Sequence, residues 1–337
     1  MLPIGAQAES ELTVYGHVHN GIVSKSYEDA QPDGTAKDTT TDVNTNGSRF
    51  GFNASGDLGN GLNALAKLEF GVGTDDADNE NGIGTRHGFV GVSGGFGKVT
   101  VGQQSGAFHT SVHTDQSIWQ AGIGGISPGS RTPNTIKYSN AVGPLSIQAD
   151  LRLSDENSSN GPQGDGGAIG LRAAVSDNLT LAVAFDTNDS TNIETITPAT
   201  FKLDGSVDME GSKSNGKETD FVGVSGLASF GNFWGSLAWV QKDETSADGK
   251  TNTVTDFTQL WAGVHLTEST QAVFGYGQKE KDEMNAKTPT ATTFGVSHDL
   301  GGGLKIWYEG KVLDDDDPKA TMKDAEATHQ IGLWYIF

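Results

Sequence analysis

Apolar and polar residues alternate along most of this chain, and that pattern indicates strands with one apolar face. In residues 145–153, 179–186 and 304–312, every second side chain is apolar and most of those between are polar or small. A period of two is the period of a β-strand, whereas a helix needs apolar residues three and four apart. These segments therefore predict β-strands.

The whole chain carries sixteen such segments, and the connections between them alternate in length. The predicted strands start near Glu11, Ser48, Leu62, Thr85, Lys98, Thr132, Leu145, Ala168, Leu179, Asp220, Asn232, Phe257, Gln271, Ala291, Leu304 and Thr328. Short, turn-like connections lie at 56–61, 93–97, 140–144, 176–178, 230–232, 267–269 and 299–303. Long polar connections lie at 24–47, 73–84, 105–131, 155–167, 189–219, 242–256, 281–290 and 314–327.

This rhythm favours a closed barrel in a membrane. In lipid every backbone polar group must be paired within the protein, so a spanning sheet has to close on itself. Outer-membrane barrels have short periplasmic turns and long extracellular loops, and about sixteen strands leave a wide, water-filled lumen. A soluble sandwich would also alternate, but it would not need every second connection to be short. We predict an all-β fold, a sixteen-stranded transmembrane antiparallel β-barrel, with residues 9–337 as one domain.

The first eight residues stand apart from the strand pattern. Ala6-Gln7-Ala8 has the A-x-A form of a signal-peptide cleavage site, but no basic region and no apolar core precede it. We interpret residues 1–8 as the remnant of a signal segment or an expression scar, and an ordinary frayed terminus is the alternative.

Composition narrows the function classes. The net charge of −21, from 43 acidic and 22 basic residues, argues against nucleic-acid binding, which needs a basic surface. The absence of cysteine excludes disulfides, thiol catalysis and cysteine metal sites. No run of about 18 apolar residues predicts a membrane-spanning helix, but an alternating barrel strand needs no such run.

Several stretches resemble the Gram-negative general porins. Residues 48–52, 57–62 and 68–70 resemble their second and third strands, and residues 86–103 resemble their fourth and fifth. In the last strand Ile331, Leu333, Tyr335 and Phe337 share one face, and the ending Tyr335-Ile336-Phe337 resembles the family's assembly signal. The resemblance implies a homotrimeric, sixteen-stranded channel in the outer membrane of a Gram-negative bacterium. It also implies that the third long loop, about 105–131, folds into the pore and that loop 73–84 latches onto a neighbouring subunit.

The resemblance further implies a ladder of basic wall residues that faces acids on the inward loop. By position the ladder maps to His17, Arg49, Arg86 and Arg131. Strand parity independently favours a lumen position for Arg49, because an arginine facing lipid at mid-membrane costs about 2–4 kcal/mol. The alternative is that these arginines are solvated near the rim. Asp115 is the only carboxylate of the loop, which lacks the family's usual proline- and acid-bearing motif.

A channel of this kind would pass ions and small hydrophilic solutes by passive diffusion, without a cofactor and without enzyme activity. We predict a mild cation preference, because the loops and the mouth carry most of the negative charge and pore charges sort ions by sign. The implied partners are other subunits and the outer-membrane lipid, including lipopolysaccharide.

Other functions stay open at this stage. Trp119 in the inward loop could stack on sugar rings and make an oligosaccharide-selective channel, or it could anchor the loop. A barrel adhesin or receptor and an outer-membrane enzyme are further alternatives. His109 and His113 have the spacing of two metal ligands on a helix, and the run Asp314, Asp315, Asp316, Asp317 could hold a hard divalent cation. Solvated loop side chains are the default for both groups.

Overall fold

The computed structural model describes most of the chain. The described residues are 10–26, 39–75, 82–112, 117–118, 122–153, 165–190, 194–197, 200–201, 207–209, 212–282, 288–314 and 327–337. Within this part of the chain, no helix has the length and apolar character needed to cross a membrane.

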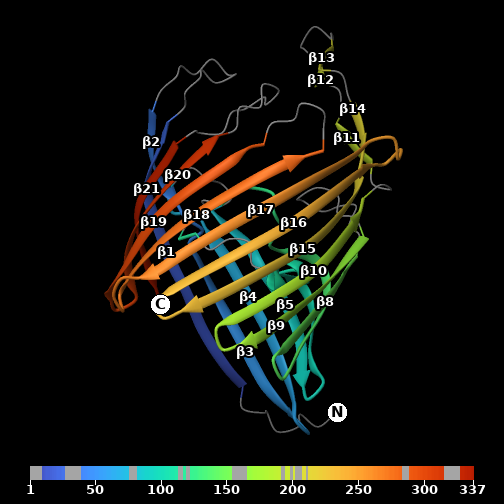
Figure 1. Ribbon diagram of the computed structural model, residues 1–337. Coiled ribbons are helices and arrows are strands. Elements are labelled where there is room, and N and C mark those ends of the chain that lie inside the picture. The colour runs from blue at the N-terminus through green and yellow to red at the C-terminus, as the bar shows by residue number, and fades with distance from the viewer. Residues whose placement is uncertain are drawn as a thin grey trace.

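The fold is a closed antiparallel β-barrel (Figure 1). Its strands are β1 (Ser10–Ser26), β2 (Thr39–Thr45), β3 (Arg49–Gly59), β4 (Leu62–Val72), β5 (Ile83–Gly94), β6 (Gly97–Gln104), β7 (Thr132–Val142), β8 (Leu145–Arg152), β9 (Asp165–Ser176), β10 (Leu179–Asp189), β15 (Lys217–Phe230), β16 (Phe233–Ser246), β17 (Asn252–His265), β18 (Thr270–Lys281), β19 (Thr290–Gly301), β20 (Leu304–Asp314) and β21 (Ala327–Ile336). Each barrel strand pairs with the next, and β21 pairs with β1, which closes the ring. Because β2 and β3 both pair with β1, they form one barrel strand, and the predicted count of sixteen is confirmed.

The interruption between β2 and β3 is a β-bulge. His17 lies opposite Arg49 and Asn20 lies opposite Thr45, so three residues, 46–48, face two residues of β1. Gly47 takes up the extra length with a φ of 70°, a conformation that a side chain would disfavour. The bulge turns the chain just before Arg49 enters the lumen wall.

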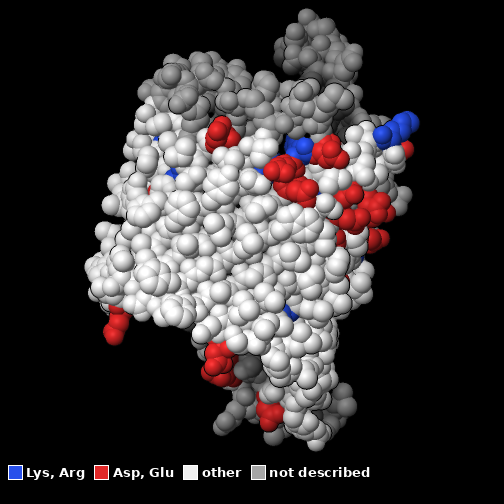
Figure 2. Space-filling model, viewed as in Figure 1, with Lys and Arg blue, Asp and Glu red and all other residues white. Residues whose placement is uncertain are grey.

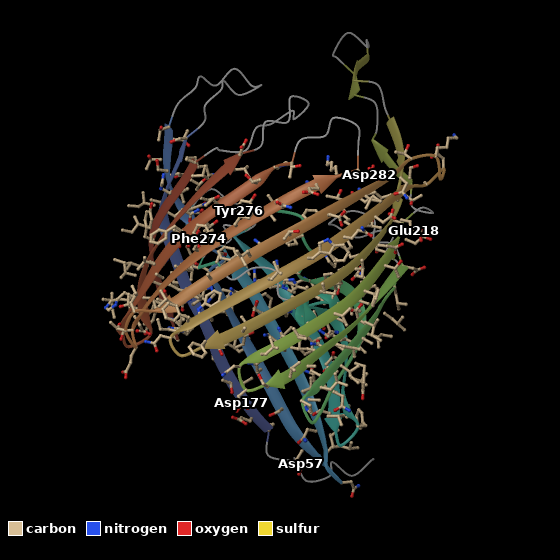
Figure 3. All side chains as sticks on the ribbon, in the orientation of Figure 1. Asp57, Asp177, Glu218, Phe274, Tyr276 and Asp282 are labelled. Atoms are coloured by element: carbon tan, nitrogen blue, oxygen red, sulfur yellow. The ribbon has the colours of Figure 1, made fainter. Side chains whose placement is uncertain are left out.

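The outer surface of the barrel is apolar. Side chains with the outward parity include Leu12, Val14, Val18 and Phe294, all strongly exposed. Phe274 and Tyr276 are further examples and are labelled in Figure 3. Figure 2 shows a wide band on the visible face in which few charged residues appear, with carboxylates gathered toward both ends. The band matches the apolar wall expected of a barrel in lipid.

Basic residues of the strands point to the other side. Directly opposite residues of an antiparallel pair share a face, so the register assigns each side chain to the lumen or to the outside. All lysines and arginines in the described barrel strands face the lumen. They are Lys25, Arg49, Lys67, Arg86, Lys98, Lys137, Arg152, Arg172, Lys217, Lys242, Lys279, Lys281, Lys305 and Lys311.

Many carboxylates of the long-loop end instead face outward. Asp220 lies directly opposite Asp243, and Asp256 lies directly opposite Glu280. Figure 3 labels Glu218 and Asp282 at the same end of the barrel, and Asp57 and Asp177 at the end of the short turns. Other carboxylates share the lumen face with the bases, among them Glu69, Asp150, Asp186, Glu244 and Glu309, so acids occur on both faces of the wall whereas the described strand bases occur on one.

Two of the predicted long loops contain more strand than expected. Residues 189–219 include the short hairpins of β11 (Glu194–Thr197) with β14 (Ser212–Asn215) and of β12 (Thr200–Phe201) with β13 (Val207–Met209). The predicted loop 242–256 is mostly strand, because β16 and β17 continue their pairing to Thr245 and Asn252. Polar side chains on both faces beyond the membrane hide this pairing from a pattern search.

Candidate functional site

A cluster of charged side chains lies on the lumen wall formed by β1, β3, β4 and β5, and Glu69 is at its centre. The Glu69 side chain is buried, with 3% of the residue exposed. Its carboxylate lies 2.8 Å from Arg86 Nε, 3.6 Å from Lys67 Nζ and 3.7 Å from Arg49 Nη1. One acid is thus shared by three bases from three strands.

Two further groups complete the contacts of Glu69. The Tyr15 hydroxyl donates a hydrogen bond of 2.9 Å to Oε2, and Lys67 Nζ lies 5.1 Å from the centre of the Tyr15 ring. His87 Nε2 lies 3.8 Å from Oε1. The carboxylate is therefore held in one position by donors on all sides, and it cannot turn toward the lumen without losing them.

A second bulge brings Arg86 and His87 to the same carboxylate. Glu69 pairs with His87, but the next residue, Phe70, pairs with Thr85, so Arg86 is the extra residue of β5. Successive residues of a regular strand point to opposite faces, and the bulge removes that restriction. Both side chains can then face the lumen.

His17 connects β1 to the same cluster. Arg49 Nε donates a hydrogen bond of 3.2 Å to His17 Nε2, which also lies 3.0 Å from the carbonyl oxygen of Gly47. The neighbouring wall is aromatic: the His17 and Trp334 rings meet edge to face at 5.3 Å, and His19 stacks on Trp334 at 4.7 Å.

Arg131, which directly precedes β7, belongs electrostatically to this cluster. Burial and the positive charges of Arg86 and Arg49 lower the pKa of Arg131, while Glu69 opposes that effect. The four ladder positions derived from the sequence, His17, Arg49, Arg86 and Arg131, therefore lie in one electrostatic environment. The roles assigned to them stay predictions.

Residues 105–112, which include α1 (Ala107–Ser111), pack against the inner wall on the other side. The backbone N–H of Ala107 donates a hydrogen bond to Asp150 on β8. Lys137 Nζ on β7 donates to the Ser105 carbonyl oxygen at 2.8 Å and to Thr110 Oγ1 at 2.9 Å. These bonds fix the start of the segment to the wall.

The ring of Phe108 is the apolar anchor of the same segment. Phe108 is fully buried and its ring centre lies 5.9 Å from that of Phe221 on β15. The ring fits because the facing wall residue is Gly223, where a Cβ atom would lie 2.7 Å from the Phe108 ring. Gly170 makes room for Ser111 in the same way, because a Cβ atom at Gly170 would lie 2.1 Å from Ser111 Oγ.

The rest of the described segment continues along the inner wall to β20. The backbone N–H of Ile118 donates a hydrogen bond of 2.8 Å to Glu309. A Cβ atom at Gly295 would lie 2.7 Å from Ile118, and one at Gly277 would lie 3.0 Å from Ile123. The described parts of segment 105–131 therefore contact the lumen face from β7 round to β20.

His109 of α1 lies in a buried, positively charged setting. Burial lowers its pKa from the usual value, and the nearby charges of Arg131 and Lys137 lower it further. Docking of α1 therefore favours the neutral form of the imidazole. His113, the second half of the proposed metal pair, lies outside the described residues.

Several sequence-derived candidates fall in parts of the chain that the structure does not describe. They are Asp115, Trp119, Asp315, Asp316 and Asp317. Asp314 ends β20 and is exposed. Among the described residues, no group of three histidine or acidic side chains has the arrangement of a metal site.

The pairing of β21 with β1 that closes the barrel is extended by Phe337. Gly16 and Phe337 exchange two backbone hydrogen bonds of 3.0 Å, and the Phe337 ring covers Gly16. Tyr335 and Phe337 lie side by side on the outer face, with ring centres 6.2 Å apart. Their role as an assembly signal stays a prediction.

Sequence reasoning missed Glu69, Lys67 and His87. Alternation within Leu68-Glu69-Phe70 is enough to direct Glu69 inward, but it does not say which distant strands supply the partners. The pairing of β4 with β3 and β5 supplies them.

Comparison with known proteins agrees with this architecture. A family model described as Gram-negative porin matches residues 2–318. The chain belongs to this family. It is an integral β-barrel protein of the outer membrane, and the expectation that it is not an enzyme is confirmed by the family.

The porin resembles one known protein in part of its sequence and others in its fold. It is 40% identical over 103 residues to the major outer membrane protein P.IB of Neisseria sicca, a match that covers 30% of this chain and 28% of that relative. The anion-selective porin from Comamonas acidovorans has a TM-score of 0.74 at 19% identity, over 98% of this chain and 100% of that one. OmpT of Vibrio cholerae in its trimer form has a TM-score of 0.72 at 15% identity, over 97% and 99%.

Proposed function

We propose that this porin forms a water-filled channel for the passive diffusion of ions and small hydrophilic solutes. The observation that carries the proposal is the division of side chains by the wall: apolar groups face outward, and charged groups line the inside. A charged inner wall retains water, whereas a dry barrel core would need apolar inward side chains.

The narrow zone of this channel lies between the Glu69 cluster and segment 105–131. The described parts of the segment contact strands from β7 to β20, which leaves the wall of β1 and β3–β5, with Arg49 and Arg86, to face the passage. Asp115 and Trp119 of the same segment are further candidates for the zone. Charges fixed at a constriction act on every ion that passes.

The zone favours anions. Arg49, Lys67 and Arg86 share one acid, Glu69, and Arg131 adds a further positive charge to the same electrostatic environment, so positive charge is in excess there. The structural similarity to the anion-selective porin from Comamonas acidovorans supports this sign. The mild cation preference expected from the total charge is the competing prediction, and it remains untested.

We also propose a homotrimer in contact with outer-membrane lipid and lipopolysaccharide. The trimer form of the similar Vibrio cholerae OmpT supports the oligomeric state. The exposed apolar band supports contact with lipid chains.

Single-channel recording in planar bilayers tests the function. A trimer of open channels would show three equal steps of current. Under a potassium chloride gradient, an anion-selective channel would give a reversal potential with the sign expected when chloride permeates better than potassium. Absence of conductance would refute the channel and favour an adhesin or receptor, whereas conductance with a potassium-type reversal potential would refute only the anion preference.

A further inference from the structure

A polar recess lies on the inner face of the barrel near the short turns, away from the Glu69 cluster. It has a volume of about 440 Å³. Its lining residues are Asp177, Asn178, Thr180, Leu227, Ser229, Trp234 and Gln271. Thr180 and Leu227 lie directly opposite each other, and both side chains have inward parity. Trp234 and Gln271, on β16 and β18, also have inward parity. Figure 3 labels Asp177 at the end of the barrel where the short turns lie.

Trp234 provides a flat apolar platform in this recess. It lies directly opposite Gly263 on β17, and its indole covers that glycine. A Cβ atom at Gly263 would lie 2.1 Å from Trp234 Cε2 and 2.4 Å from Nε1, so only glycine allows this position. One face of the ring is thus fixed against the wall, and the other face is turned to the recess.

Polar side chains without partners surround the platform. The Asp177 carboxylate, the amides of Asn178 and Gln271 and the hydroxyls of Thr180 and Ser229 line the same space. None of these side chains forms a hydrogen bond with another residue in the described part of the chain. They are free to bind a solute from the lumen.

We propose that this recess binds one ring of a neutral sugar. This inference rests on the proposed channel function and adds a solute class to it. A pyranose presents a flat C–H face, which packs on an indole, and a rim of hydroxyls, which pair with amide, hydroxyl and carboxylate groups. An inorganic anion would be repelled by Asp177, and an apolar solute would leave the polar groups unmatched.

The site differs from the sugar-binding alternative considered for Trp119. It lies at the short-turn mouth, not in loop 105–131, and it has built-in hydrogen-bonding partners. A sugar held there would obstruct one end of the channel without altering its charge. The binding should therefore appear as partial, voltage-independent blocks of the ionic current.

Current recordings with added maltotriose test the proposal. Wild-type channels are expected to show transient blocks, more frequent when the sugar is added on the short-turn side. Trp234→Ala should weaken the association by about three- to tenfold, the free energy of one aromatic contact. Trp239, on the same strand but with outward parity, provides the matched control Trp239→Ala.

A second variant keeps the proposal testable if Trp234→Ala fails to fold. Gln271→Ala removes a hydrogen-bonding group and leaves the Trp234–Gly263 contact intact, so it should also weaken sugar binding while conductance and reversal potential stay unchanged. If wild-type channels conduct but maltotriose does not block them, the proposed sugar site is refuted and the proposed channel function is not. An equal effect of Trp234→Ala and Trp239→Ala would overturn it as well.

Discussion

Replacing Glu69 with glutamine is the most direct test of the charge arrangement at the narrow zone. The substitution keeps the size of the side chain and removes one negative charge from among Arg49, Lys67 and Arg86. The lumen there becomes more positive, so the preference for anions should rise. The protein should also lose stability, because three cations lose their shared counter-charge, although their partial exposure to water limits the loss.

The size of the effect follows from Coulomb's law. One unit charge about 6 Å from an ion in water changes the energy of that ion by about 0.7 kcal/mol, or about threefold in a Boltzmann ratio. Removing the negative charge stabilises an anion and destabilises a cation by this energy. The ratio of chloride to potassium permeability should therefore rise about three- to ninefold at low salt. Screening over about 10 Å at 0.1 M salt should shrink the change as salt is added.

The assay is the reversal potential of planar bilayers under a potassium chloride gradient. Glu218→Gln makes the same change of charge on the outward face of β15 and is the matched control. A Glu69→Gln channel with an unchanged reversal potential, or one shifted toward potassium, would refute the assignment of Glu69 to the ion path. A shift of equal size in Glu218→Gln would show that the effect is not local.

Three further predictions concern the wall and segment 105–131. Arg86→Gln should lower the ratio of chloride to potassium permeability about three- to ninefold at low salt by the same Coulomb argument, measured as a reversal potential. Phe108→Ala deletes a fully buried ring at a cost of about 3–5 kcal/mol to the docking of α1, and it should raise single-channel conductance and current noise. His109 stays neutral because burial and the charges of Arg131 and Lys137 lower its pKa, so the undocked segment binds a proton that the docked one does not. Docking should therefore weaken as the pH falls below about 6.5, and single-channel conductance and current noise should increase between pH 7 and pH 5 in the wild type but not in His109→Gln.

The period-two pattern predicted the barrel strands well. The predicted starts Leu62, Thr132, Leu145, Leu179 and Leu304 coincide with the observed ones. A single apolar face is visible in a local window, and the turns that precede several of these strands contain glycine. Closure of the barrel followed from the requirement that no strand edge may face lipid.

The pattern was insufficient where the chain departs from regular pairing. Residues 46–48 have no alternation, so the long first part of the second barrel strand, β2, was assigned to a loop. Arg86 and His87 are adjacent, and a regular strand would place them on opposite faces, which concealed the role of His87. Both failures come from bulges, and bulges depend on the partner strand as much as on the local sequence.

The contacts of the candidate site could be predicted only in part. Parity directs Arg49 inward, but the hydrogen bond between Tyr15 and Glu69 joins residues 54 positions apart. Such a contact is fixed by the register of three strands together. The fit of Phe108 against Gly223 likewise depends on the path of a loop that no local pattern describes.

The inward orientation of every described strand lysine and arginine has a consequence for how such proteins are compared. A chain with a net charge of −21 will migrate and adsorb as a polyanion. A solute in transit, however, meets all the lysine and arginine side chains of the described barrel strands but only part of the acids, because Glu218, Asp220 and Asp256 face outward. Bulk electrophoretic behaviour and permeation therefore sample two unrelated electrostatic surfaces, and the isoelectric point of a barrel protein is no guide to the ions that it admits.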